Sequence, residues 1–241
     1  VNGQTIYGGN AVVDGTVLQA SDGLKINDVL IEMLSTQTTD NVSAGDKANA
    51  INAKSALTGV IASGSNSIDI VLGLGQATMA EHSTATINGV TVDFSGDTSV
   101  KDVVDAVNAA MSGNNDIVAS TTTEGNLQLS SASGATIAVN DTTATTGGAG
   151  KLFVSATYTR DGSTATITNG VGTLRGFIDL TSLDGTAIKI EDGQQDTAVD
   201  TGTDRIGFSS TNEEGTESRG VSVATVDAAS SSLSSLDTAL E

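Results

Sequence analysis

The sequence of 241 residues contains no cysteine, no proline and only one histidine. Without cysteine, the chain can form no disulfide, and it offers no thiolate nucleophile and no cysteine-based zinc or iron–sulfur site. A single histidine excludes metal motifs that need two, and a Ser-His-Asp triad would have to use His82. His82 lies in the polar stretch MAEHSTAT, for which a solvated linker is the better interpretation.

Aromatic and basic residues are also scarce. Phe, Tyr and Trp make up 2% of the chain, so Ala, Val, Ile and Leu provide nearly all of the apolar volume. Such small side chains suit thin modules better than a deep ligand cavity. Ten basic residues against twenty-nine acidic ones give a formal net charge of −19. This charge repels phosphates and anionic lipid surfaces, so we expect no nucleic acid and no membrane partner.

No apolar run approaches the ~18 residues that a membrane-spanning helix requires. The first ten residues, VNGQTIYGGN, lack the charged and apolar regions of a cleavable signal peptide. If the protein is exported, it must therefore use another route.

The sequence contains only incomplete versions of the motifs that bind phosphate, dinucleotides or calcium. The stretch GGAGKL at residues 147–152 differs from a phosphate loop, because Thr145 stands where glycine is needed and Leu152 where a magnesium-binding hydroxyl is needed. In the pair Gly73 and Gly75, the third glycine of a dinucleotide fingerprint is replaced by Thr78. An acidic group lacks the alternating pattern of a calcium loop and is better explained as a solvated loop: Glu191, Asp192, Asp196, Asp200 and Asp204. We therefore expect no catalytic residue, no metal site, no cofactor and no enzymatic activity.

One pattern occurs twice. The first copy has an alternating strand pattern over residues 24–31, a helix over residues 44–56 that ends at Gly59, and short strands at residues 60–62 and 68–71. In this first helix, Ala48, Ile51 and either Ala56 or Leu57 share one side.

The second copy has a strand or tight hairpin around Asn88-Gly89, then a helix over residues 98–111 with Asp97 or Thr98 as its N-cap. Strands follow at residues 117–120, 127–130 and 135–139. The apolar residues of this helix have helical spacing: Val100, Val103, Val104, Val107 and Met111. Residues 50–53 (AINA) match residues 106–109 (AVNA), which pairs Ile51-Asn52 with Val107-Asn108.

From residue 151 the helical period disappears. Residues 152–159, 163–168, 173–180 and 187–191 read as antiparallel strands joined by Asp-Gly turns, residues 192–204 show no pattern, and DRIGFSS at residues 204–210 reads as a further short strand. Near the C-terminus the spacing changes to that of a heptad seam. The helix that carries this seam either packs on its own domain or continues beyond Glu241. The seam residues are Val226, Ala229, Leu233, Leu236 and Leu240.

These stretches resemble bacterial flagellin. DKANAINAKSALTGVIAS and TINGVTVDFSGDTSVKDVVDAVNAA, followed by NLQLSSASGATIAV, are similar to the flagellin hook IN motif, with Ile51-Asn52 and Val107-Asn108 as its Ile-Asn positions. GTLRGFIDLTSLDGTAIKIED is similar to the strands that end such a motif. SVATVDAASSSLSSLDTALE is similar to the start of the flagellin C-terminal core helix. Filament caps and hook-associated proteins share the IN motif.

The resemblance implies an α+β fold of strand-helix-strand-strand modules with an antiparallel β region and a C-terminal amphipathic helix stub. It implies a structural, extracellular role in the flagellar filament and export without a cleaved signal peptide. Partners would be other flagellin subunits, bound through terminal helices outside this chain, so this chain alone would be monomeric. Because both ends must return to the filament core, we expect a nested order: residues 1–14 as a connection, residues 15–75 with 150–218 as an inner domain, residues 80–148 as an inserted module and residues 221–241 as the start of the core helix. The rivals are a cap or hook-associated protein and an extracellular adhesin or binding module.

Overall fold

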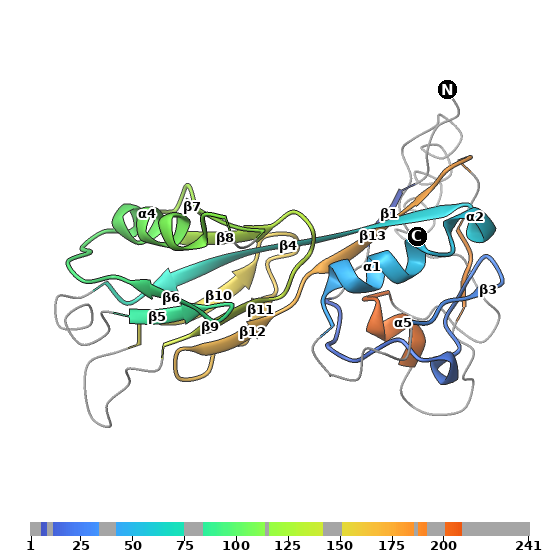
Figure 1. Cartoon of the computed structure of the whole chain (residues 1–241), viewed down its shortest axis with the longest axis horizontal. Helices are drawn as coiled ribbons and strands as arrows, with labels where there is room; N and C mark the ends of the chain where they lie inside the picture. The colour runs from blue at the N-terminus through green and yellow to red at the C-terminus, as the bar shows by residue number, and fades with distance from the viewer. Residues whose placement is uncertain are drawn as a thin grey trace, which may run out of the picture. The chain divides into compact units, whose positions relative to one another are not determined.

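The computed structural model describes residues 6–8, 12–33, 42–74, 84–113, 116–141, 151–185, 188–191 and 201–208 (Figure 1). The chain forms two compact units, Val1–Gly64 with Phe177–Glu241 (unit 1) and Ser65–Gly176 (unit 2). Both units combine antiparallel sheets with a few helices, so the predicted α+β class is confirmed. None of the described helices has the length and apolar character needed to cross a membrane.

The unit boundaries differ from the predicted domain boundaries. The sequence placed residues 65–75 and 150–176 in the inner domain, whereas the structure groups them with residues 84–141 in unit 2. The physical reason is strand pairing. β10 (Phe153–Tyr158) pairs with the second half of β4 (Val60–Leu72), and β12 (Val171–Leu174) pairs with β9 (Ile137–Asn140).

Unit 1 is built from two separated segments of the chain. Its three-stranded sheet has the order β14-β2-β3, and in its second sheet β13 lies between β1 and the first half of β4. The apolar core of unit 1 includes Leu24, Ile51 and Ile206, each fully buried. The further elements are β1 (Ile6–Gly8), the 3-10 helix η1 (Ala20–Asp22), β2 (Lys25–Ile26), β3 (Val29–Leu30), α1 (Ala44–Asn52), α2 (Ser55–Thr58), β13 (Phe177–Ser182), β14 (Ile190–Glu191) and α5 (Thr201–Arg205).

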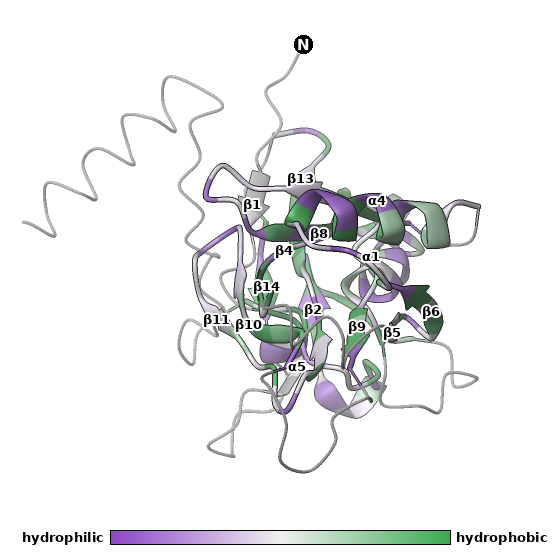
Figure 2. Cartoon of the chain, turned by 90° about the vertical axis from the view of Figure 1, so that its left-hand side faces the viewer, coloured by the Kyte–Doolittle hydropathy of each residue, from purple (hydrophilic) through white to green (hydrophobic). Residues whose placement is uncertain are grey.

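The described part of unit 2 contains two sheets and one helix. In the first sheet β8 pairs with both β7 and β4, and β10 joins β4 to β11; the second has the order β12-β9-β5-β6. Helix α4 contacts β7, β6 and β8, and it carries both strongly apolar and strongly polar residues (Figure 2). The further elements are β5 (Thr84–Ile87), β6 (Val90–Asp93), α4 (Val100–Met111), β7 (Ile117–Thr121), β8 (Leu127–Ser131) and β11 (Thr164–Ala165).

Both long helices begin with the same capping box. The Ser43 hydroxyl accepts a hydrogen bond from the Asp46 amide at the start of α1, and Ser99 does the same with Asp102 in α4. In each case the aspartate carboxylate accepts a hydrogen bond from the serine amide, so two otherwise unpaired backbone donors are satisfied. The predicted N-cap of α4, Asp97 or Thr98, was therefore wrong, because Ser99 is the first residue whose hydroxyl reaches the third helical amide.

Several predicted strands have different limits. Residues 24–31 form the hairpin β2–β3, because Asn27 and Asp28 have positive φ angles of 48° and 66°. The strands predicted at 60–62 and 68–71 form one strand of 13 residues, since buried and exposed positions alternate through Gly64. Residues 173–180 are split between β12 and β13.

Two helical predictions also need correction. In the first copy, Ala48 and Ile51 are buried as expected, but Ala56 and Leu57 are exposed because the helix stops at Asn52 and restarts as α2. Near the C-terminus, residues 201–205 are helical and Gly207 has a φ of 78°, so the strand predicted from residue 204 is wrong. His82 and the predicted seam lie outside the described residues: Val226, Ala229, Leu233, Leu236 and Leu240.

Candidate functional site

The predicted motif residues form the same contact in both units. Ile51 and Val107 are fully buried, and each is followed by an asparagine whose side chain reaches the next strand. Asn52 donates from Nδ2 to the Ala62 carbonyl at 2.8 Å and accepts from the Ala62 amide at 2.7 Å. Asn108 makes the same pair of bonds with Ala119, both at 2.9 Å. We call this paired contact the asparagine clamp.

The clamp copies backbone pairing. An asparagine side chain is an amide with one acceptor and two donors, so it can bind the amide and carbonyl of one strand residue as a neighbouring strand would. The clamp joins the last turn of each helix to the strand that follows it, over 10 residues in unit 1 and 11 in unit 2. It therefore fixes the position of the helix along its strand.

A second pair of asparagines, Asn27 and Asn88, makes side-chain contacts that the sequence did not predict, although Asn88 was expected at a hairpin turn. Each stands at a hairpin turn with positive φ, 48° and 49°. Asn27 accepts from the Lys189 amide and donates to the Thr58 carbonyl. Asn88 accepts from the Ala138 amide and donates from Nδ2 to the Thr136 carbonyl. The signal that could have identified them is the dipeptide Ile-Asn, which precedes the second strand of both hairpins at residues 26–27 and 87–88.

The ends of the two copies also correspond. Residues 127–140 (LQLSSASGATIAVN) align with residues 178–191 (IDLTSLDGTAIKIE), and Gly134 and Gly185 occupy the same turn with φ of 76° and 81°. In each copy the hairpin pairs with the last strand, Ile26 opposite Ile190 in unit 1 and Ile87 opposite Val139 in unit 2. Each copy of the repeat therefore consists of a hairpin, a helix and three strands in that order. In unit 1 the first of the three strands is β4 and the second is β13, and residues 65–176 lie between the two parts of unit 1.

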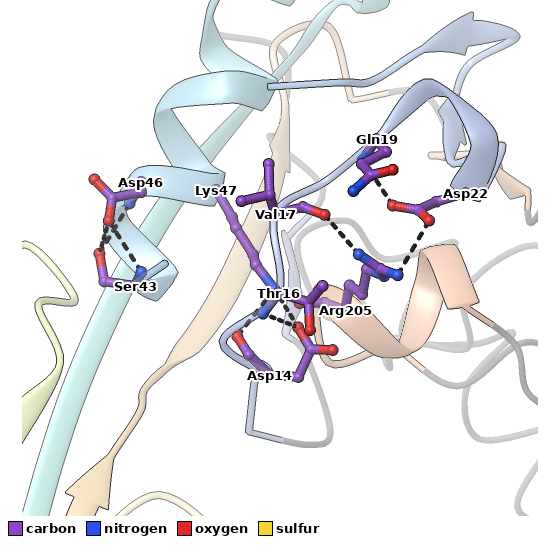
Figure 3. A network of polar contacts seen from close by, with 9 residues as sticks. All are labelled: Asp14, Thr16, Val17, Gln19, Asp22, Ser43, Asp46, Lys47 and Arg205. Carbon is purple, nitrogen blue, oxygen red and sulfur yellow. Dashed lines mark hydrogen bonds and ion pairs between the residues drawn. The ribbon is translucent and has the colours of Figure 1, made fainter. Parts of the chain in front are cut away.

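One equivalent position differs in chemistry. Four residues after its N-cap serine, α1 has Lys47 and α4 has Val103, and both side chains are fully buried. The Lys47 ammonium donates to the Asp14 carbonyl at 3.0 Å, to the Asp14 carboxylate at 2.8 Å and to the Arg205 carbonyl at 2.5 Å (Figure 3). A buried charge with three acceptors avoids the penalty of an unpaired one.

Arg205 continues this network. Its guanidinium donates to the Val17 carbonyl at 2.6 Å and forms an ion pair with buried Asp22 at 3.2 Å. The other Asp22 oxygen accepts from the Gln19 amide, which closes η1 (Figure 3). Lys47 and Arg205 thus join the two chain segments of unit 1.

The electrostatic effect is visible at Asp14. Partial burial of its carboxyl group acts to raise the pKa, but the hydrogen bond and the charge of Lys47 act in the opposite direction together with Thr16. The resulting pKa of Asp14 lies below its ordinary value. Asp14 is therefore held as a carboxylate beside the Lys47 ammonium.

The described residues offer no cluster of side chains suited to binding a metal ion: they contain no group of three that could hold one. Of the acidic group considered in the sequence, Glu191 forms an ion pair with Lys189 at 2.8 Å and Asp204 lies on α5, while Asp192, Asp196 and Asp200 are outside the described residues. Leu152 occupies the position at which a phosphate loop would need a hydroxyl group. It is buried directly before β10, and its amide donates to the Asp141 carboxylate.

No protein-family model matches this chain, and no curated protein shows a significant match to it.

Proposed function

We propose that this chain is the surface-exposed outer part of a bacterial flagellar filament subunit. One observation carries the proposal. The residues through which the sequence resembles the flagellin IN motif, Ile51-Asn52 and Val107-Asn108, are the residues that build the same clamp in both units. The resemblance therefore rests on positions with a definite physical task rather than on composition.

The chemistry of the chain suits this role. A subunit that crosses an export channel unfolded must refold outside the cell without help. A chain with no cysteine forms no wrong disulfide, and one with no proline avoids slow peptide-bond isomerisation during refolding. The net charge of −19 keeps exposed surfaces of neighbouring subunits soluble and apart. In this proposal the subunits associate through helices outside the described residues, and the chain has no cofactor and catalyses no reaction.

Immunogold electron microscopy tests the proposal. An antibody raised against this chain is applied to cells that carry the gene, with a deletion strain as the control. The expected result is label along the whole length of the filament. Label confined to the filament tip or to the hook junction would identify a cap or hook-associated protein instead, and label over the cell body would identify an adhesin.

A further inference from the structure

The described residues contain two Asn-Gly dipeptides, Asn88-Gly89 and Asn169-Gly170, in nearly the same local sequence, INGV and TNGV. Each dipeptide forms a two-residue hairpin turn in which both residues have positive φ angles. These angles are 49° and 77° in the first turn and 53° and 78° in the second. Because sequence and backbone conformation are matched, a difference in reactivity has to come from the contacts of the two asparagine side chains.

An asparagine followed by glycine is prone to a reaction with its own backbone. The glycine amide nitrogen loses its proton to solvent and attacks Cγ of the asparagine side chain. The new C–N bond closes a succinimide ring, and the side-chain nitrogen takes up a proton and leaves as ammonia. Water then opens the ring to aspartate or isoaspartate, so no oxidant or reductant is needed. Glycine favours the reaction because it has no side chain that obstructs the approach of its nitrogen.

The attacking nitrogen is available in both turns. Within the described part of the chain, neither glycine amide donates a hydrogen bond and neither asparagine carbonyl accepts one. The second turn is closed by two backbone hydrogen bonds between Thr168 and Val171, at 2.8 and 3.0 Å, but these leave the peptide group between Asn169 and Gly170 unengaged. The backbone therefore gives both asparagines the same opportunity to react.

The two side chains, in contrast, have different contacts. Asn88 accepts from the Ala138 amide at 2.6 Å and donates to the Thr136 carbonyl at 2.8 Å, so its carboxamide is held against β9. Asn169 is exposed, and its side chain makes no hydrogen bond to a described residue. Asn88 must break two hydrogen bonds before its Cγ can turn toward the glycine nitrogen, whereas Asn169 has none to break.

We propose that Asn169 is a site of spontaneous deamidation in the folded protein, and that Asn88 is protected from the same reaction by its contacts with β9. The inference rests on these contacts and does not depend on the proposed filament role. Either product adds a negative charge to the turn, and isoaspartate also lengthens its backbone. The change falls beside a buried contact, because the Gly170 carbonyl accepts from the amide of buried Asp141 at 3.0 Å.

The test follows both asparagines in one sample of the full chain. The protein is incubated in mildly alkaline buffer, once folded and once in urea, and peptides that contain residue 88 or residue 169 are analysed by mass spectrometry over time. Each rate in the folded chain is divided by the rate of the same residue in urea. Breaking two hydrogen bonds before the attack should make this quotient about tenfold smaller for Asn88 than for Asn169. Asn2-Gly3 lies outside the described residues and is followed as a separate peptide.

Asn169→Gly is the matched control variant, because glycine tolerates the positive φ angle and removes the reactive side chain. The residue-169 peptide of this variant should stay unmodified, and its Asn88 should react as in the wild type. Equal quotients for Asn88 and Asn169 overturn the proposal, because the side-chain contacts would then not decide the rate. An Asn169 that stays intact in the folded chain but reacts in urea overturns it as well, because the closed turn itself would then be protective.

Discussion

Units 1 and 2 share a hydrogen-bonded frame but hold their helices on their sheets by different means. In unit 2 the buried face of α4 is apolar, with Val103, Val107 and Met111 all buried. In unit 1 the position of Val103 is taken by Lys47, which binds Asp14 and the Arg205 carbonyl. The comparison shows that the asparagine clamps define the repeat, while the residues between them can change from apolar packing to an ionic network.

The difference matches the connectivity of the units. Unit 2 is one continuous segment, so apolar burial is sufficient to hold its strands together. Unit 1 consists of two segments separated by the whole of unit 2, and its network joins residues up to 188 positions apart. Polar contacts have stricter geometry than apolar ones, so they fix how the second segment docks on the first.

The largest effect is expected from Lys47→Ala. This change leaves the Arg205 carbonyl without a buried partner and creates a cavity, and it should destabilise unit 1 by about 3 kcal/mol. Lys47→Met, which keeps the side-chain volume, should lose only about 1 kcal/mol. Hydrogen exchange at the amides of Ile51 and Val107 reports the two units separately, and protection should fall at Ile51 first. Equal losses for both variants would show that the lost polar contacts of Lys47, and not the cavity left by the shorter side chain, set the cost.

The clamps should have equal weight in the two units. Asn52→Ala and Asn108→Ala each remove two hydrogen bonds and should cost about 1–2 kcal/mol in urea unfolding. Asn49→Ala is the matched control, because Asn49 is an exposed asparagine on α1 and alanine is a better helix former. The shared frame would be refuted if N52A behaved like N49A while N108A did not.

The capping boxes give a smaller effect. Ser43→Ala and Ser99→Ala should each destabilise their own unit by about 1 kcal/mol. Replacement by threonine keeps the hydroxyl acceptor and should recover most of the loss. Thermal unfolding of the four variants measures this, and a loss that threonine fails to recover would count against the capping role.

Loss of the contact between Asp14 and Lys47 should contribute to the weakening of unit 1 in acid. The folded-state pKa of Asp14 is lowered, so its contribution is present above the unfolded pKa and is lost as the pH falls through the folded value. NMR titration should show the Asp14 carboxyl titrating below its ordinary pKa in the wild type and closer to it in K47M. An unchanged Asp14 pKa in K47M would mean that Thr16 alone stabilises the carboxylate.

The sequence predicted the fold class and most elements of unit 2, because that unit is continuous and its patterns are strong. The apolar spacing from Val103 to Met111 specifies α4, and Asn88-Gly89 specifies the hairpin β5–β6. The sequence also identified Asn52 and Asn108 as equivalent positions in the two copies. Those residues recur with the same neighbours, which is a local signal.

The features that the sequence could not predict depend on contacts between residues that are far apart along the chain. Lys47 reads as a polar residue on a helix, and its acceptors lie 33 and 158 residues away. The unit boundary near Gly64 is hidden because the alternation of β4 continues through it. The partners of Asn27 and Asn88 become visible only when the hairpins pair with β14 and β9.

The pairing of Ile26 with Ile190 joins residues on either side of unit 2 and sets an order of events during folding. Unit 2 consists of residues 65–176 alone, so it needs none of β13, β14 and α5. Unit 2 can therefore close while the first segment of unit 1 still lacks its partners. Because contacts between distant residues slow folding, unit 1 should be the rate-limiting step, and the finished unit 2 then shortens the effective loop that unit 1 has to close.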